Sequence, residues 1–240
     1  MINNNSAIIL ARAGSKGIPG KNWIDFSGFP LICWSIFAAL ENDCCETVIV
    51  SSDSREIRDI CNSMNDKRII FLPRPESISG DKSPSELAIS HALSVVQHSD
   101  DCKIAFLQPT SPFRHGNIIS KCFDAISRGE SSFTVTGNTP LFWSLNDRGF
   151  LSKNYASRKM RQEYNDNEIM WHDCGNAYCF YAGDFALKAD RHFGECRGIK
   201  ADYLHALQID SNLDLELCRK VNQIGVVCEW MSSVAKSWRK

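Results

Sequence analysis

Short apolar runs, each closed by turn-forming residues, recur along the chain with amphipathic segments between them. Apolar runs of this length are typical of strands buried on both faces, and such strands alternate with helices around a mostly parallel sheet. We therefore predict an α/β protein with a mostly parallel sheet flanked by helices. The predicted strands are Ala7–Ala11, Thr47–Ser51, Ile69–Leu72, Lys103–Leu107, Ser132–Thr136, Ala177–Ala182 and His205–Ile209.

Polar turns predict where several helices begin. Ser83-Pro84-Ser85-Glu86 places a serine before a proline and a glutamate, which predicts a helix with Pro84 at its first position and Ser83 as its N-cap. Two further turns, at Asp53 with Glu56 and at Ser211 with Asp214, have similar spacing and precede the predicted helices Ile57–Met64 and Leu213–Val221.

Length and charge restrict the number of domains and the kinds of partner. A chain of 240 residues with 43% hydrophobic content can bury one good-sized core, and we expect a single domain over residues 1–240. The formal net charge of -1 gives no global field that would attract nucleic acid or an anionic membrane. The start of the chain does not look like a secretion signal, and no apolar run approaches the roughly 18 residues of a membrane-spanning helix. We expect a cytoplasmic protein that binds neither nucleic acid nor membrane.

The cysteines have no pattern of their own. Eleven are scattered, several of them within the apolar runs, which favours buried thiols in a reducing compartment over a disulfide framework. Cys174 and Cys179 have no second pair at the spacing of zinc ligands. We therefore interpret the cysteines as structural or inert.

The regular alternation breaks between Asn138 and Trp171. This stretch mixes aromatic and charged residues without a clear period, and a long irregular stretch inside a compact domain usually has a function. We interpret residues 138–171 as an excursion that packs on a second subunit of a homodimer and brings basic groups toward a site. A disordered surface insertion is the alternative interpretation.

A basic, glycine-containing loop directly follows the first predicted strand. Its sequence is Ala11-Arg12-Ala13-Gly14-Ser15-Lys16-Gly17-Ile18-Pro19-Gly20-Lys21-Asn22. The glycines allow backbone N–H groups to approach an anion, and Arg12, Lys16 and Lys21 supply positive charge, so the loop suits a polyphosphate. It has neither the ending of a Walker A loop nor the spacing of a dinucleotide-binding fingerprint. Taken by itself, it could also be a solvated turn.

Three further motifs follow the basic loop from Arg12 to Asn22. They are Arg74-Pro75-Glu76 with Ser79-Gly80-Asp81, Leu107-Gln108-Pro109-Thr110-Ser111-Pro112-Phe113-Arg114, and Ile209-Asp210-Ser211-Asn212-Leu213-Asp214-Leu215. In this order, the four motifs resemble those of the acylneuraminate cytidylyltransferases, the family that makes CMP-sialic acids and includes legionaminic and pseudaminic acid cytidylyltransferases. The resemblance covers most of the chain and implies a Rossmann-like fold of the nucleotide-diphospho-sugar transferase type.

The resemblance also implies site residues and a cofactor. Arg12, Lys21 and Asp210 would be catalytic, and Gln108 would contact the sugar. Asp210 would bind Mg²⁺, for which a carboxylate is a suitable hard ligand, while Asp214 would be a first-turn helix carboxylate. The nucleotide-binding residues would be Ala11, Arg12, Ala13, Gly14, Ser15, Lys16, Asn22, Arg74 and Asp81. Because several motifs follow strands, they should converge at the carboxyl ends of a parallel sheet.

Two positions depart from the family pattern. Several members carry two acids at the last strand, where this chain has Gln208-Ile209-Asp210. If residues 208 and 210 lie on one face of a strand, Gln208 could offer a carbonyl or hold a metal-bound water, and Asp81 or Asp53 could replace the missing acid. On the sugar side Phe142 stands where sialic acid enzymes have a lysine, which leaves Arg161, or alternatively Arg158, to pair with the sugar carboxylate.

The implied reaction is attack of the anomeric hydroxyl of a nine-carbon acidic sugar on the α-phosphorus of CTP, with release of pyrophosphate, for surface polysaccharide or glycan biosynthesis. Positioning and charge neutralisation provide most of the catalysis in such a step. His172 is a candidate base, although a histidine beside an aspartate is more often structural. Two alternatives are a cytidylyltransferase for another acidic sugar, such as 3-deoxy-manno-octulosonic acid, and a catalytically inactive CTP-binding relative.

Overall fold

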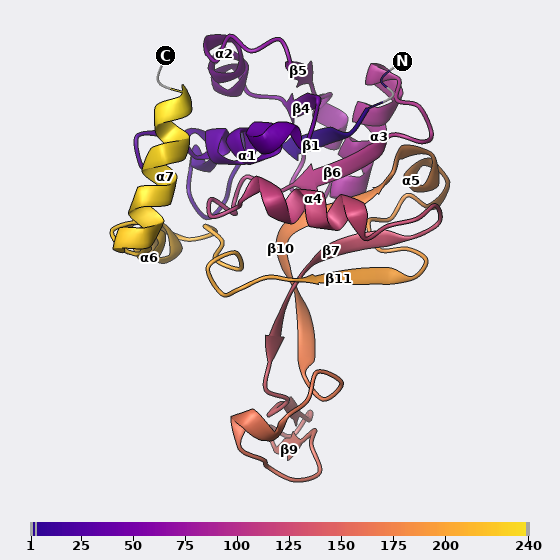
Figure 1. Ribbon diagram of the computed structural model, residues 1–240, viewed down its shortest axis with the longest axis vertical. Helices are drawn as coiled ribbons and strands as arrows, with labels where there is room; N and C mark the ends of the chain where they lie inside the picture. The colour runs from indigo at the N-terminus through magenta and orange to yellow at the C-terminus, as the bar shows by residue number, and fades with distance from the viewer. Residues whose placement is uncertain (1, 3, 239–240) are drawn as a thin grey trace.

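A computed structural model describes residues 2 and 4–238. Seven strands form a central sheet in the order β11-β7-β10-β6-β1-β4-β5 (Figure 1). Neighbouring strands are parallel except where β10 pairs with β6 and with β7, so the predicted mostly parallel α/β sheet is confirmed. The strands are β1 (Ser6–Leu10), β4 (Thr47–Ser52), β5 (Ile69–Pro73), β6 (Lys103–Leu107), β7 (Ser131–Asn138), β10 (Met170–Tyr181) and β11 (Cys196–Lys200).

Helices cover both faces of this sheet. The side chains of β1 alternate between the two buried clusters, with Ala7 and Ile9 in one and Ile8 in the other, which explains why the strand is apolar from Ala7 to Leu10. Helices α1, α2, α4, α6 and α7 contribute to the first cluster, and α3 and α5 to the second. The helices are α1 (Leu31–Leu40), α2 (Arg55–Ser63), α3 (Ser85–Val96), α4 (Gly116–Asp124), α5 (Ala182–Lys188), α6 (Asn212–Val221) and α7 (Gly225–Trp238).

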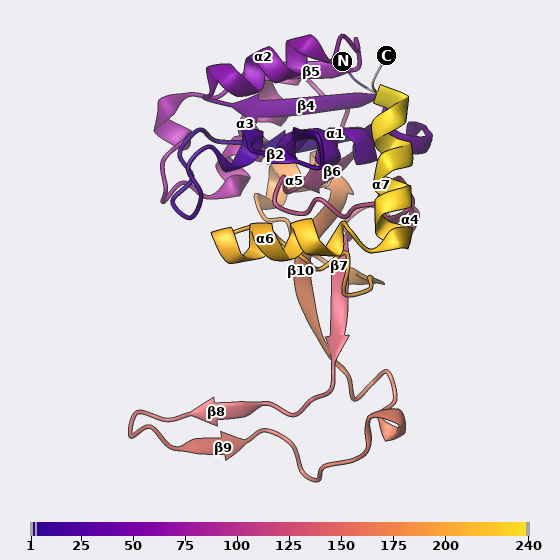
Figure 2. The same cartoon turned by 90° about the vertical axis from the view of Figure 1, so that its left-hand side faces the viewer.

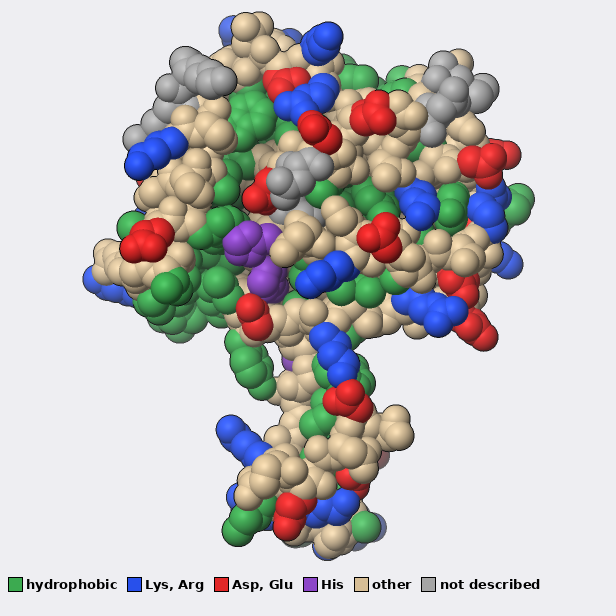
Figure 3. Space-filling model, in the orientation of Figure 1, with side chains coloured by type: hydrophobic (Ala, Val, Ile, Leu, Met, Phe, Trp, Pro, Cys, Tyr) green, Lys and Arg blue, Asp and Glu red, His purple; other side chains and the backbone are tan. Residues whose placement is uncertain are grey.

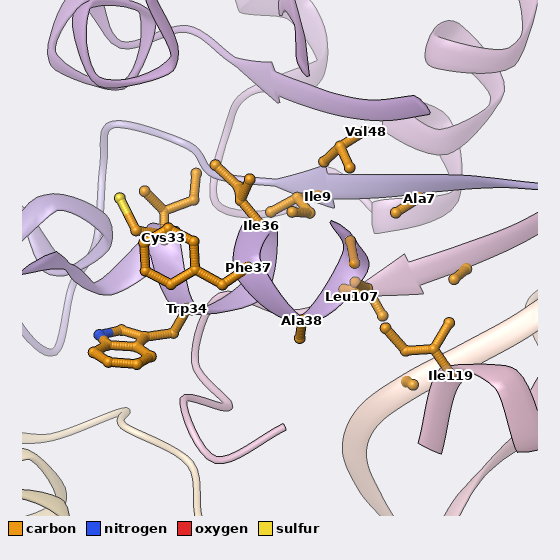
Figure 4. Close-up of a cluster of buried hydrophobic side chains, with 14 of the residues drawn as sticks. Ala7, Ile9, Cys33, Trp34, Ile36, Phe37, Ala38, Val48, Leu107 and Ile119 are labelled. Carbon is orange, nitrogen blue, oxygen red and sulfur yellow. The ribbon is translucent and has the colours of Figure 1, made fainter. Parts of the chain in front are cut away.

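Helix α1 is buried along its whole length. Its side chains, Ile36 and Ala38 among them, lie in one buried cluster with Ile9 of β1 and Leu107 of β6 (Figure 4). On its outer side it is covered by α7, where the rings of Phe37 and Trp238 stack with centroids 5.0 Å apart. A helix that is hydrophobic on all sides needs such cover.

Local capping predicted one helix start well and two others only approximately. The Ser211 hydroxyl accepts from the Asp214 amide, and the Asp214 carboxylate accepts from the Ser211 amide, so the predicted capping box begins α6. Helix α2 is capped by Ser54 instead of Asp53. Helix α3 begins at Ser85 with Pro84 in the N-cap position and no side-chain cap, so the prediction of Ser83 as the cap was wrong.

The prediction of a strand at His205–Ile209 was also wrong, because the last strand of the sheet is β11, nearer the N-terminus. The carbonyl of His205 is bonded by the side chain of Asn176, and the amide of Ile209 donates to the carbonyl of Thr110, 2.8 Å away. These bonds to a side chain and a turn replace a strand ladder. Asp210 consequently lies in a bend directly before α6, and residues 208 and 210 do not share a strand face.

Strands β7 and β10 leave the sheet together and carry an arm away from the body (Figures 1 and 2). The arm lies between Asn138 and Met170, close to the predicted limits of 138–171. It ends in a hairpin that, in Figure 2, runs under α6 at a distance from the body. The short elements of the chain are β8 (Trp143–Leu145), β9 (Leu151–Lys153), β2 (Asp25–Phe26), β3 (Phe29–Pro30), and the 3-10 turns η1 (Lys21–Trp23), η2 (Glu41–Asp43), η3 (Glu76–Ile78) and η4 (Arg161–Glu163).

Candidate active site

The loop after β1 is held in place by its own backbone groups. The amide of Ala11 donates to the carbonyl of Ser51 at 3.0 Å, and the amide of Ala13 donates to the Asp53 carboxylate at 2.7 Å. The Asn22 side chain donates to the carbonyl of Arg12 at 3.0 Å and closes the loop. These three hydrogen bonds fix the shape of the loop.

Glycine at position 17 brings this loop against the far end of the chain. A Cβ atom at Gly17 would lie 2.1 Å from the carbonyl oxygen of Asp210, so no larger residue fits without moving one backbone. The same approach places Lys21 beside Asp210, with 2.8 Å between Nζ and Oδ1. The Lys21 side chain is 14% exposed and that of Asp210 is 64% exposed, so the carboxylate faces solvent.

A cleft of about 440 Å³ opens over this loop, which is within the usual range for a small-molecule site. It lies at the carboxyl ends of β1 and β6, where the sequence predicted that the motifs would converge. Its lining residues are Leu10, Arg12, Ser15, Lys16, Gly17, Lys21, Asn22, Arg74, Ile78, Gly80, Asp81, Ser83, Pro84, Ser85, Ala88, Phe106, Gln108, Pro109, Thr110 and Asp210.

Carboxylates pair with the cations of the loop. Asp81 bonds Arg12 through one oxygen and Lys16 through the other, the latter at 2.9 Å. The hydrogen bonds from Lys16 and from Arg12 lower the pKa of Asp81, so this carboxyl is ionised at neutral pH. A polyphosphate that enters the cleft competes with Asp81 and Asp210 for the same cations.

Arg74 supplies a further, buried cation to the cleft. Its side chain donates from Nε to the hydroxyl of Ser51 at 3.1 Å and from a terminal nitrogen to the carbonyl of the same residue. Burial is the main reason that the pKa of Arg74 lies below its ordinary value; Asp53 opposes this shift and Arg12 adds to it. Arg74 and Arg12 are close enough for their charges to repel, and an anion placed between them relieves that repulsion.

Gln108 lies at the end of β6, on the floor of the cleft, and Arg114 holds its backbone. The Arg114 guanidinium is 1% exposed and donates to the Gln108 carbonyl at 2.9 Å, to the Ser35 hydroxyl at 2.8 Å and to Asn176 Oδ1 at 2.8 Å. Burial lowers the pKa of Arg114, and no carboxylate is among the groups that oppose this shift. The hydrogen bonds that Arg114 donates to described residues go to neutral groups of Ser35, Gln108 and Asn176, and these bonds fix the floor.

Most residues that the sequence assigned to the site lie together, but several do not. Ala11 is buried and outside the cleft lining, and Ala13 and Gly14 also lie outside it. The amides of both alanines are already bonded, so these residues shape the loop. Arg161 lies in η4 on the arm and does not line the cleft of its own chain.

His172 and Gln208 have structural partners of their own. The ring nitrogens of His172 lie 2.8 Å from the Thr136 hydroxyl and 3.0 Å from the Asn138 amide, at the base of the arm. Neither His172 nor Gln208 lines the cleft, which argues against His172 as the base and Gln208 as a metal ligand.

The sequence motifs did not indicate that the start of α3 and the two residues before it form a wall of the cleft. Ser83, Pro84, Ser85 and Ala88 line the cleft, and the first turn of α3 has no side-chain cap. A proline before a helix, close behind Asp81, was the available signal, because the side chain of proline has no acceptor for first-turn N–H groups.

The carboxylates of the cleft suit one kind of metal site. The described residues contain no group of three or more His, Cys, Asp or Glu side chains that could hold an ion by themselves. Mg²⁺, however, is commonly held by one or two carboxylates together with substrate phosphates. Asp210, exposed beside the loop that suits a polyphosphate, fits that role.

The comparisons with known proteins agree with this geometry. Residues 6–226 match the family described as Cytidylyltransferase. The chain belongs to this family. It is 33% identical to the N-acylneuraminate cytidylyltransferase of Escherichia coli over 227 residues, which cover 90% of this chain and 52% of that protein. It is 28% identical to the pseudaminic acid cytidylyltransferase of Campylobacter jejuni over 181 residues, which cover 72% of this chain and 77% of that protein.

A third relative is the CMP-N,N'-diacetyllegionaminic acid synthase of Legionella pneumophila, 41% identical over 110 residues that cover 45% of this chain and 47% of that protein. The chain thus spans about half the length of two of these three relatives. Two solved structures share the cytidylyltransferase fold. One is a CMP:2-keto-3-deoxy-manno-octonic acid synthetase complexed with CTP, with a TM-score of 0.63, 15% identity and coverage of 91% of this chain and 98% of that one. The other is the 4-diphosphocytidyl-2C-methyl-D-erythritol synthase of Anaerococcus prevotii, with a TM-score of 0.69, 14% identity and coverage of 92% and 96%.

Proposed function

We propose that this protein transfers CMP from CTP to the anomeric hydroxyl of a nine-carbon acidic sugar of the sialic, legionaminic or pseudaminic acid type, and releases pyrophosphate. The observation that carries the proposal is the cleft itself, in which Arg12, Lys16, Lys21 and Arg74 converge beside Asp210. The relatives named above act on three sugars of this class. The product would serve surface polysaccharide or glycan biosynthesis.

In the proposed reaction the sugar hydroxyl attacks the α-phosphorus, an oxygen–phosphorus bond forms, and the bond between the α-phosphorus and the oxygen bridging to the β-phosphate breaks. The hydroxyl loses its proton to solvent water. Negative charge grows on the departing pyrophosphate, and Lys21 and Arg12, which line the cleft, would neutralise it. The loop would therefore contribute twice. It would bind the triphosphate in one orientation, and it would stabilise the pyrophosphate leaving group.

Asp210 would hold Mg²⁺ in this site together with phosphate oxygens of CTP. The metal would neutralise part of the charge of the triphosphate. Asp210 must then exchange its bond to Lys21 for the metal, which would free the Lys21 ammonium to bind phosphate.

We also propose that the arm joins two copies of the chain. Trp143, Leu145 and Leu151 lie on one face of the hairpin because Leu145 pairs with Leu151 and residues two apart share a face. All three are exposed, and Figure 3 shows hydrophobic side chains on the surface of the arm. A two-stranded hairpin is marginally stable by itself, so its apolar face needs a partner. In such a homodimer Arg161 of one chain could approach the cleft of the other and pair with the sugar carboxylate.

No helix among the described residues is long and apolar enough to cross a membrane. We propose the cytoplasm as the site of action, because the enzyme would need CTP and because most of the cysteines are buried thiols, as in proteins of reducing compartments.

The experiment that tests the proposal measures pyrophosphate release from CTP and Mg²⁺. N-acetylneuraminic, legionaminic, pseudaminic and 3-deoxy-manno-octulosonic acids are supplied separately. Release with one of the first three establishes the reaction and identifies the sugar. Release with the octulosonic acid alone would move the enzyme to the other acidic-sugar class, and CTP binding without release would favour an inactive CTP-binding relative.

A further inference from the structure

Both polar atoms of the Gln208 side-chain amide form hydrogen bonds near the floor of the cleft. Its Nε2 donates to the carbonyl of Cys174 at 2.6 Å, and its Oε1 accepts from the Thr110 hydroxyl at 3.2 Å. Only the NH₂ group of an amide can donate to a carbonyl, so the bond to Cys174 fixes which way the amide is turned. Gln208 therefore links the segment before α6 to β10 and to the turn after β6.

Thr110 connects this link to the substrate side. Its hydroxyl lies 3.5 Å from Gln108 Oε1, and both Thr110 and Gln108 line the cleft. The carbonyl of Thr110 accepts from the Ile209 amide at 2.8 Å, so residues 208 and 209 hold Thr110 from two sides. The position of the Thr110 hydroxyl beside Gln108 thus depends on Gln208.

Gly175 leaves the space in which the two glutamines meet. A Cβ atom there would lie 1.8 Å from Gln208 Nε2 and 3.3 Å from Gln108 Oε1. Gly175 also has a φ of +69°, a conformation that favours glycine, and its amide donates to Asp173 at 2.8 Å. The turn at Gly175 and the amide of Gln208 are therefore fitted to each other.

We propose, on the basis of the proposed function, that Gln208 is a positioning residue for the acceptor sugar and takes no part in binding the metal. It holds Thr110 and the turn at Cys174 and Gly175 so that Gln108 presents its amide to the acceptor. An acid at this position would place carboxylate oxygens against the Cys174 carbonyl and could not donate to it. The amide is thus required by contacts of this chain that lie away from Asp210.

The test compares Gln208→Glu, which keeps the size of the side chain, with Asp210→Asn. We expect Gln208→Glu to raise the KM of the acceptor sugar about tenfold, since a hydrogen bond of the floor is lost and a repulsion is added. The KM of CTP and the Mg²⁺ concentration that gives half-maximal rate should stay within about twofold of wild type. Asp210→Asn should do the reverse and change mainly the Mg²⁺ dependence.

Thr110→Val removes the hydroxyl that donates to Gln208 Oε1, so it tests the same contact through the other residue. The test then does not depend on the folding of one variant. It should also raise the acceptor KM, and its combination with Gln208→Glu should raise it by less than the product of the single effects. Circular dichroism checks that each variant is folded. A Gln208→Glu enzyme with an unchanged acceptor KM, or with a changed Mg²⁺ dependence instead, would overturn this inference alone. Wild-type protein that releases no pyrophosphate with any sugar would overturn the proposed function, and this inference with it.

Discussion

Lys21 and Asp210 lie 189 positions apart in the chain and meet in the cleft. The basic loop and the acidic residue were both predicted from the sequence as separate motifs. Their direct contact was not, because it depends on the close approach of the Gly17 and Asp210 backbones. The pairing of Arg12 and Lys16 with Asp81 depends on tertiary packing in the same way.

Lys21→Ala tests the role of this pair. The variant removes a cation from the leaving-group side and leaves Asp210 unpaired where phosphates should bind, so we expect kcat to fall by about 10² to 10³. Lys220→Ala, an exposed lysine on α6, is the control and should retain full activity. The measurement is pyrophosphate release at saturating CTP and sugar, and an active Lys21→Ala enzyme would remove this residue from the catalytic site.

Arg114 contributes at the residue scale to stability. Arg114→Met would leave the carbonyls of Gln108 and Asn176 without their donor, and we expect the free energy of unfolding to fall by about 2 to 4 kcal/mol. Arg55→Met is the control, because Arg55 is exposed and its pair with Asp59 should contribute less than about 1 kcal/mol. Urea unfolding, with the m-value unchanged between variants, measures the free energy of unfolding of both. Equal urea midpoints for Arg114→Met and Arg55→Met would show that the buried hydrogen bonds of Arg114 add little stability.

At the scale of elements, the sequence predicted those whose signals are local. The apolar runs of β1, β4, β5 and β6 were identified almost to the residue, and Ser211 marked the start of α6. The segment 205–209 has an apolar pattern too, but its backbone bonds go to Asn176 and Thr110, which no local signal shows. Strand β11 is half polar and exposed, and lies at the sheet edge, so it lacked the pattern of a buried strand.

The cap of α6 gives a prediction for an element. Ser211→Ala removes the hydroxyl that accepts from the Asp214 amide, and we expect a loss of about 1 kcal/mol of stability. The same substitution at Ser90, exposed in the middle of α3, should instead be neutral or stabilise by about 0.5 kcal/mol, because alanine favours a helix interior. The Tm of Ser211→Ala should therefore fall, whereas the Tm of Ser90→Ala should stay the same or rise slightly. A shift of equal size and sign in both would contradict the cap.

At the scale of the whole molecule, the proposed role of the arm would make the catalytic unit a pair of chains. The cleft has cations for a triphosphate, but among the described residues that line it no cation lies outside the basic loop and Arg74. The candidate partner for a sugar carboxylate, Arg161, lies on the arm. Binding of an acidic sugar is thus expected to depend on a second copy of the chain, whereas binding of CTP is not.

That dependence can be tested by separating the copies. Leu145 and Leu151 are 69% and 62% exposed in the single chain and share a face of the hairpin, so aspartate at both positions would place charge in the proposed contact. We expect the double variant Leu145→Asp with Leu151→Asp to be a monomer in analytical ultracentrifugation, with CTP affinity near wild type and an acceptor KM raised at least tenfold. Ser152→Asp, on the opposite face of the same hairpin, should remain a dimer with wild-type kinetics. Wild-type protein that is monomeric at the concentrations of the assay and fully active would show instead that each chain binds its sugar alone, and Arg161 would then have no part in the site.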